Sequence, residues 1–203
     1  GVPYTYSGAV GQFDNPTYWY TYENQSYLTD PVDPNTQCWY ARANITLDGA
    51  SNLVITARRQ DRVDSSGRTW RYTSGRMDSQ HKFFQAYGAW EFKAKLPTAA
   101  GCWPGSVWMV GEAWTSNPQN WPGVGEIDIA EWYPGLVSSD TNKVGQNVLH
   151  PESAWGNGET HPNTIPGTTS NRVNDFHVYR LEWSNTEMKF FIDPTKDANG
   201  TVT

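Results

Sequence analysis

Short segments in which apolar and polar residues alternate recur along this 203-residue chain. Every second residue is apolar in 89–96, and a period of two also runs through 176–183. Because successive side chains of a strand point to opposite faces, both segments are predicted to be strands with one buried and one solvated face. Further strands are predicted at residues 52–59, 70–78, 144–150 and 187–193. Many short strands without a long helix favour an all-β fold, a β-sandwich.

Glycine and proline separate these segments, with 18 Gly and 13 Pro in the chain. Stretches rich in Pro and Asn at 30–37, 114–123 and 151–171 are predicted to be loops with the size to shape a cleft. A chain of this length can bury a sizeable core. Since the sequence shows no internal repeat and no linker, residues 1–203 are predicted to form a single domain.

Three acidic residues within one predicted strand carry the strongest chemical signal. Glu126, Asp128 and Glu131 lie in the run Gly-Glu-Ile-Asp-Ile-Ala-Glu-Trp-Tyr. Glu126 and Asp128 share a face, whereas strict alternation would place Glu131 on the other one. One extra residue, a β-bulge, would bring Glu131 back beside them. Like charges this close push their pKa values apart, which suits glycoside hydrolysis with an ionised nucleophile and a protonated general acid.

Two plainer interpretations fit the same acids. Acidic residues that alternate with apolar ones often form only the solvated face of a strand, and several carboxylates together can also bind a hard cation. The tryptophans around the acids favour the hydrolytic interpretation, because aromatic rings stack on the apolar faces of sugar rings. These tryptophans are Trp103, Trp108, Trp114, Trp121 and Trp132.

Several spaced motifs carry a family resemblance. Residues 87–97 match the pattern Y-G-x-x-E-x-x-x-K-x-P, and residues 175–183 match D-F-H-x-Y-x-x-E-W. Together with the acidic run at 121–131, they resemble glycoside hydrolase family 16, in particular its laminarinase-like branch of endo-β-1,3-glucanases. The similar segments span most of residues 20 to 193. The resemblance implies a concanavalin A-like jelly roll with a substrate cleft on its concave sheet.

The resemblance also implies roles for individual residues. Glu126 is expected to attack the anomeric carbon, Glu131 to act as acid and base, and Asp128 to hydrogen-bond Glu126 and tune both pKa values. Trp103 or Trp108 is expected to form the floor beneath the sugar. Further substrate-binding residues are expected at Arg76, His150 and Trp132. A surface ion pair is the alternative for Arg76, and a structural role is the alternative for His150.

The expected activity is endo-acting, retaining hydrolysis of β-1,3-glucan or mixed β-1,3/1,4-glucan. A galactan- or agar-type hydrolase, a glucan transglycosylase and a non-catalytic β-glucan-binding module are the alternatives on the same fold. A binding module would not need Glu126 and Glu131, and both are present. The acids therefore favour an enzyme.

Charge and hydropathy bear on the partners. The formal net charge is −6 with 15 Lys and Arg, and no basic patch indicates nucleic acid. No apolar run approaches the length of a membrane span. The expected partner is a polysaccharide substrate, with no nucleic acid and no membrane. No cofactor is expected, and the sequence does not indicate a structural calcium ion.

Two further expectations concern the cysteines and the end of the chain. A secreted, extracellular protein is expected, and its two cysteines, Cys38 and Cys102, are predicted to form a disulfide, with two free buried thiols as the alternative. The resemblance leads us to expect at least one more core strand after Ile192. That strand is predicted to come from further residues of the protein or from a second chain, which would leave Phe190 and Ile192 beside an open sheet edge here.

Overall fold

The computed structural model describes residues 38–63, 67, 69–77, 79, 83–99, 105–112, 122–132, 143–150, 159–164 and 173–203. The chain divides into two compact units, Gly1–Phe84 and Gln85–Thr203. Strands dominate the described part of both units. No helix in these residues is long and apolar enough to cross a membrane.

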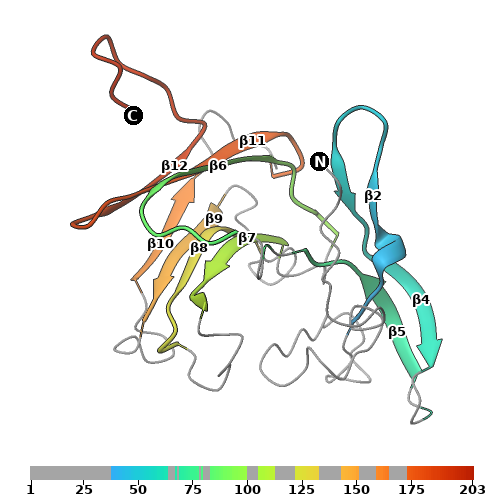
Figure 1. Cartoon of the computed structure of the whole chain (residues 1–203). Helices are drawn as coiled ribbons and strands as arrows, with labels where there is room; N and C mark the ends of the chain where they lie inside the picture. Colours follow the sequence, from blue (N-terminus) through green and yellow to red (C-terminus); the bar gives the residue numbers. More distant parts are fainter. Residues whose placement is uncertain are drawn as a thin grey trace. The chain divides into compact units, whose positions relative to one another are not determined.

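The first unit contains a three-stranded sheet (Figure 1). Its central strand is β5 (Thr69–Ser74). On one side β1 (Cys38–Tyr40) runs parallel to β5, and on the other β4 (Arg58–Val63) runs antiparallel to it. Trp70 of β5 is buried against Ala41, which forms a small apolar cluster.

A hairpin follows β1 in the same unit. The 3-10 turn η2 (Arg42–Asn44) leads into β2 (Ile45–Leu47), which pairs with β3 (Leu53–Ile55). The buried side chain of Asn44 donates from Nδ2 to Thr73 Oγ1 at 2.8 Å and to the carbonyl of Ser74 at 3.3 Å. This amide therefore ties the start of the hairpin to β5.

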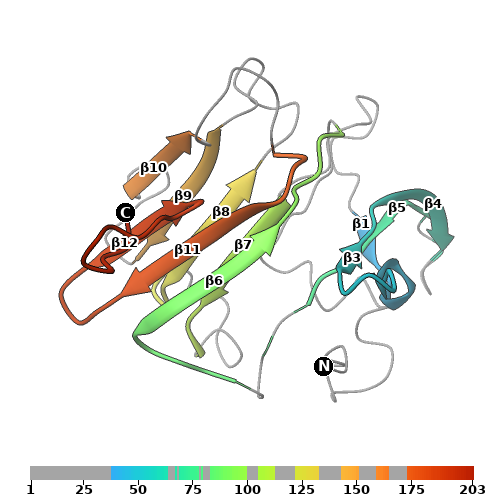
Figure 2. The same cartoon turned by 90° about the horizontal axis from the view of Figure 1, so that it is seen from above.

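The second unit contains two antiparallel sheets (Figures 1 and 2). One has the order β10-β9-β8-β7 and the other β12-β11-β6. The first sheet comprises β7 (Gly105–Val110), β8 (Glu126–Trp132), β9 (Lys143–Leu149) and β10 (Glu159–Thr164). The second sheet comprises β6 (Gly88–Ala94), β11 (His177–Trp183) and β12 (Met188–Ile192).

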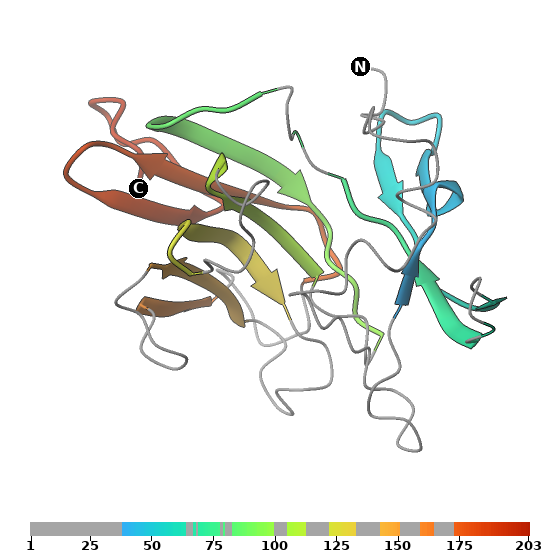
Figure 3. The same cartoon turned by 60° about the horizontal axis from the view of Figure 1, so that its bottom comes forward.

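The core of the second unit lies between these two sheets, which form separate layers in Figure 3. Ile127 and Ile129 of β8 meet Tyr179 and Leu181 of β11, and all four side chains are buried. Trp90, Ala94, Met188, Phe190 and Ile192 pack against this cluster from the strands beside β11. The described strands therefore confirm an all-β sandwich in this unit.

Most of the predicted strands are present. The strands expected at 89–96, 176–183, 144–150 and 187–193 correspond to β6, β11, β9 and β12, and that at 70–78 corresponds to β5. The segment 52–59 forms two strands instead of one, because Thr56 and Ala57 interrupt it between β3 and β4. Within β6, Phe92 remains 39% exposed although Trp90 and Ala94 pack into the core. β6 is the outermost described strand of its sheet, which leaves one flank of Phe92 uncovered by that sheet.

The prediction of a loop over 151–171 was wrong for part of that range, because residues 159–164 form β10. Their sequence, Glu-Thr-His-Pro-Asn-Thr, contains Pro and no aliphatic or aromatic residue except His, so it carries no alternating apolar signal. Pro162 is tolerated because β10 pairs only with β9 among the described strands and so lies at the edge of the sheet.

At the other sheet, β12 pairs with β11 alone among the described strands, and Phe190 and Ile192 are half-buried at this edge. The source of any strand beyond β12 stays a prediction, as does the single-domain interpretation of residues 1–203.

The side chain of Cys38 and all of Cys102 lie outside the described residues. The predicted disulfide therefore stays a prediction too.

Candidate active site

The three acids lie on β8, and this strand carries a bulge between Asp128 and Glu131. Asp128 lies opposite Asn147 of β9, and Glu131 lies opposite Gly145. The chain thus advances from 128 to 131 on β8 while it advances only from 147 to 145 on β9. The extra residue returns Glu131 to the face that carries Glu126 and Asp128, as the sequence predicted.

The apolar residues of β8 explain why the acids share one face. Ile127 and Ile129 are buried in the core between the sheets, and Ala130 has no exposed surface. Asp128 and Glu131 therefore lie on the opposite face of the same strand. The core anchors β8 from behind and presents the carboxyl groups on the face that points away from the second sheet.

Residues directly opposite the acids share their face, because cross-strand partners project to the same side of a sheet. From β7, Ser106 lies opposite Glu131, Trp108 opposite Asp128 and Val110 opposite Glu126. Trp108 is half-buried there. Its place beside the middle acid fits the expected floor for a sugar ring.

Asn147 of β9 contacts two of the acids at once. Its Nδ2 donates to Asp128 Oδ2 at 3.2 Å and to Glu131 Oε2 at 3.0 Å. One amide nitrogen can reach both carboxyl groups only if they lie close together on one face. This contact is therefore direct evidence that the bulge gathers Asp128 and Glu131.

Asp128 has the most perturbed ionisation in the site. Burial, first, and then the negative charges of Glu131 and Glu126 together raise the pKa of its carboxyl group from 3.8 to about 8. A carboxyl–carboxyl hydrogen bond with Glu126 also favours the protonated form, whereas the amide of Asn147 opposes it. A pKa of about 8 favours the protonated form of Asp128 at neutral pH, and in that form the carboxyl group can donate a hydrogen bond.

Trp132 does not lie with the acids. Its side chain is 4% exposed, belongs to the core cluster and donates from Nε1 to the carbonyl of Pro97 at 2.8 Å. The cause is the strand period: once the bulge has turned Glu131 to the acid face, the next residue points into the core. The expected sugar contact is not supported by this position.

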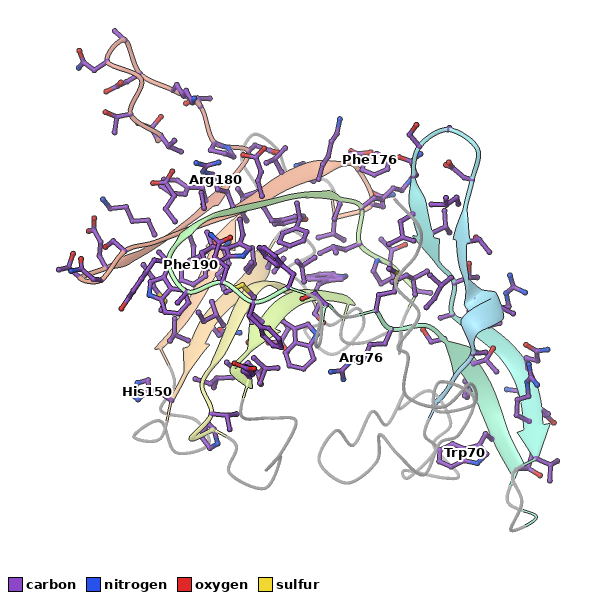
Figure 4. The ribbon with its side chains drawn as sticks, viewed as in Figure 1. Trp70, Arg76, His150, Phe176, Arg180 and Phe190 are labelled. Carbon is purple, nitrogen blue, oxygen red and sulfur yellow. The ribbon has the colours of Figure 1, made fainter. Side chains whose placement is uncertain are left out.

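The other three expected sugar-binding residues are His150, Arg76 and Trp103, and only His150 is located relative to the acids. His150 directly follows β9 and is half-buried (Figure 4). The last residue of β9, Leu149, lies opposite Glu126, so His150 follows the strand at the Glu126 end of the acids. Arg76 belongs to the first unit, and Trp103 lies outside the described residues. Sugar binding by these three residues stays a prediction.

The sequence analysis missed two amides of β9, Gln146 and Asn147. Gln146 is fully buried, and its Nε2 donates to the backbone carbonyl of Ile129 at 2.9 Å, within the bulge. Two adjacent amides in a segment predicted to be a strand were the available signal, because one of two successive strand residues faces the core and a buried amide requires hydrogen-bond partners. No group of three or more His, Cys, Asp or Glu in the described part of the chain has the arrangement of a metal site.

Comparison with known proteins defines the class to which this fold and acid face belong. The family model described as "Glycosyl hydrolases family 16" matches residues 32–199. The chain therefore belongs to glycosyl hydrolase family 16, which confirms the resemblance seen in its motifs.

Individual relatives agree with this assignment. The chain is 33% identical over 160 residues to a "Beta-glucanase" of Rhodothermus marinus, and the aligned region covers 76% of this chain and 51% of that protein. It is 30% identical over 188 residues to "Glucan endo-1,3-beta-glucosidase A1" of Niallia circulans, covering 86% of this chain and 26% of that protein. The chain thus spans about half or less of these curated relatives.

A solved structure supports the same fold. The catalytic domain of an endo-1,3-beta-glucanase (laminarinase) from Thermotoga petrophila RKU-1 matches with a TM-score of 0.66 and 31% identity. The match covers 80% of this chain and 59% of that one. The fold is thus the jelly-roll β-sandwich of the family 16 laminarinases.

Proposed function

We propose that this protein is an endo-acting, retaining glycoside hydrolase that cleaves β-1,3-glucan or mixed β-1,3/1,4-glucan. The observation that carries the proposal is the bulge of β8, which places Glu131 beside Asp128 under the shared amide of Asn147. Family membership and the glucanase names of the relatives support the substrate class.

The proposed mechanism uses the two glutamates in turn. Glu126 attacks the anomeric carbon as a carboxylate while Glu131 gives its proton to the glycosidic oxygen, so that the carbon–oxygen bond breaks and a glycosyl ester forms. Glu131, now ionised, takes a proton from water as the water attacks the same carbon. The ester bond then breaks, which restores the Glu126 carboxylate and the protonated Glu131.

Asp128 supports this cycle through its proton. With its pKa raised to about 8, it can donate a hydrogen bond to the ionised nucleophile Glu126 at neutral pH without adding a second negative charge beside it. An ionised Asp128 would instead repel the Glu126 carboxylate. Trp108, opposite Asp128, is the described aromatic ring that we propose supports the sugar at the cleavage point.

A product analysis tests the proposal. Purified protein is incubated with laminarin, lichenan, agarose and xyloglucan, and products are followed by thin-layer chromatography and by proton NMR of the new anomeric centre. We expect laminarin, with or without lichenan, to yield oligosaccharides whose first-formed reducing ends are β-anomers. The proposal would be contradicted if only agarose were cleaved, if the products first appeared as α-anomers, or if none of the four polysaccharides were cleaved.

A further inference from the structure

Two neighbouring amides on β9 contact β8 at its bulge from opposite sides. The side chain of Gln146 faces the core, has no exposed surface and donates to the carbonyl of Ile129 at 2.9 Å. The side chain of Asn147 faces the acids and donates to Glu131 and Asp128. Because successive residues of a strand point to opposite faces, adjacent amides are the arrangement that can hold both sides of one bulge.

The core-side contact meets a need that the bulge creates. A bulge leaves two residues of one strand opposite one residue of its partner and disrupts the local backbone ladder. Here Ile129 and Ala130 lie between the paired positions 128 and 131, and Gln146 is the single residue between 147 and 145. A buried carbonyl needs a hydrogen-bond donor, and Gln146 supplies one to Ile129. The donor thus favours the backbone path that turns Glu131 to the acid face.

The acid-side contact fixes the carboxyl group itself. Asn147 donates to one oxygen of Glu131, Oε2, and to Oδ2 of Asp128. The asparagine is 7% exposed, and its Oδ1 has no hydrogen-bond partner among the described residues. Gly145 leaves room for this amide, since a Cβ there would lie 3.3 Å from Asn147 Nδ2. The side chain therefore sits in a confined place against both acids.

We propose that Gln146 and Asn147 are positioning residues that together hold the carboxyl group of Glu131 in place, Gln146 through the backbone of the bulge and Asn147 through the side chain. The inference rests on the proposed hydrolytic function, in which Glu131 is the acid and base. Neither residue contacts the reacting atoms, and both act through Glu131.

Leaving-group dependence separates this role from a general loss of stability. The variants are Gln146→Met, which keeps length and apolar bulk without a donor, and Asn147→Ala. The substrates are phenyl and 2,4-dinitrophenyl β-laminaribiosides. The first leaving group needs a proton from Glu131, whereas the second departs without one. We expect kcat/KM to fall by about tenfold to a hundredfold on the phenyl substrate and to change by less than about threefold on the dinitrophenyl substrate.

Two controls accompany these variants. Glu131→Ala should show the same dependence on the leaving group in stronger form. Asn44→Ala removes an equally buried amide from the first unit, and it should lower stability while treating both substrates alike. Equal losses on both substrates for Gln146→Met or Asn147→Ala, or no loss on either, would overturn the proposal.

Two measurements test the contacts without relying on turnover. Carboxyl carbon NMR titration of Asn147→Ala should show a higher pKa for Asp128 than in the wild type, because the donor that lowers it is gone. The titratable groups of β8 on this face are Glu126, Asp128 and Glu131. The residues paired directly with them on β7 and β9 carry no titratable side chain, and Glu112 and His150 follow the two strands.

For Gln146→Met, amide hydrogen exchange at Ala130 and Glu131 should accelerate as the bulge loses its donor. A wild type that cleaves neither glucan nor aryl glycoside would refute the proposed function, while these two measurements still decide the positioning contacts. An unchanged titration and unchanged exchange would overturn the positioning role even in an active enzyme.

Discussion

His177, at the start of β11, and Asp193, directly after β12, are joined by a 2.6 Å contact between Nδ1 and Oδ2. The imidazole is buried, whereas the Asp193 side chain is 38% exposed. The other carboxyl oxygen accepts from the amide of Val178 at 2.9 Å, and the Asp193 amide donates to the Val178 carbonyl at 2.8 Å. Asp193 thus fastens the end of β12 to β11 through both side chain and backbone.

Asp193→Ala should destabilise the second unit. The change leaves a buried ring nitrogen of His177 and the Val178 amide without their acceptor, and we expect the free energy of unfolding to fall by about 2 to 3 kcal/mol. Asp193→Asn should cost less, because it keeps an acceptor oxygen and tolerates the positive φ of 51° at this position. Urea unfolding at pH 7 measures both. A cost below about 0.5 kcal/mol for alanine, typical of a surface position, would contradict the fastening role.

The two glutamates should respond differently to substitution. Glu126→Gln keeps the shape of the side chain but removes the nucleophile, so hydrolysis should nearly vanish while oligosaccharide binding, measured by calorimetry, is largely retained. Glu131→Ala should spare substrates with good leaving groups and reduce turnover of glucan by about 100-fold or more. Near wild-type turnover of Glu126→Gln would show that the nucleophile lies elsewhere.

Asp128 should make stability depend on pH in a defined window. Its folded-state pKa of about 8 lies above the ordinary value of 3.8, so between those values the unfolded chain releases a proton that the folded protein keeps. Unfolding is therefore favoured as the pH rises, and the stability that protonated Asp128 contributes below pH 4 is lost progressively toward pH 8.

Asp128→Asn cannot ionise and should lack this slope. The difference in free energy of unfolding, variant minus wild type, should therefore increase from pH 4 to pH 8 by a few kcal/mol. Each unit of pKa shift corresponds to about 1.4 kcal/mol, which sets this order of magnitude. Urea unfolding at pH 4, 6 and 8 provides the comparison, and the other acids titrate in both proteins. Parallel pH curves for variant and wild type would show that Asp128 is ionised in the folded protein.

The sequence predicted what depends on local pattern. Alternation located β6 and β11. A bulge was predicted as the way to bring Glu131 to the face of Glu126 and Asp128, and the register of β8 shows that bulge. Because side chains alternate strictly between the two faces of a strand, one extra residue moves every later side chain of that strand to the opposite face. A bulge can therefore be inferred from the sequence pattern. The same rule places Trp132 in the core, although its nearness in sequence to the acids had favoured a sugar contact.

The features that sequence did not predict depend on contacts between strands. Residues 159–164 have no apolar pattern, and only pairing with β9 makes them a strand. Gln146 and Asn147 are distant in sequence from the bulge that they contact, so their partners emerge only when β8 and β9 are in register. The raised pKa of Asp128 arises similarly, because burial and the two neighbouring charges exist only in the folded sheet.

Trp132 and Trp108 form a matched pair that tests the assignment of faces. Trp132 is in the core and donates to the carbonyl of Pro97, so Trp132→Phe should lower the free energy of unfolding by about 1 to 3 kcal/mol and leave KM for laminarin unchanged. Trp108, opposite Asp128, lies on the acid face. Trp108→Ala should therefore raise KM for laminarin at a smaller cost in stability. Urea unfolding and initial-rate kinetics on both variants separate the two effects. A raised KM for Trp132→Phe with unchanged stability would mean that Trp132 faces the sugar and that the face assignment after the bulge is reversed.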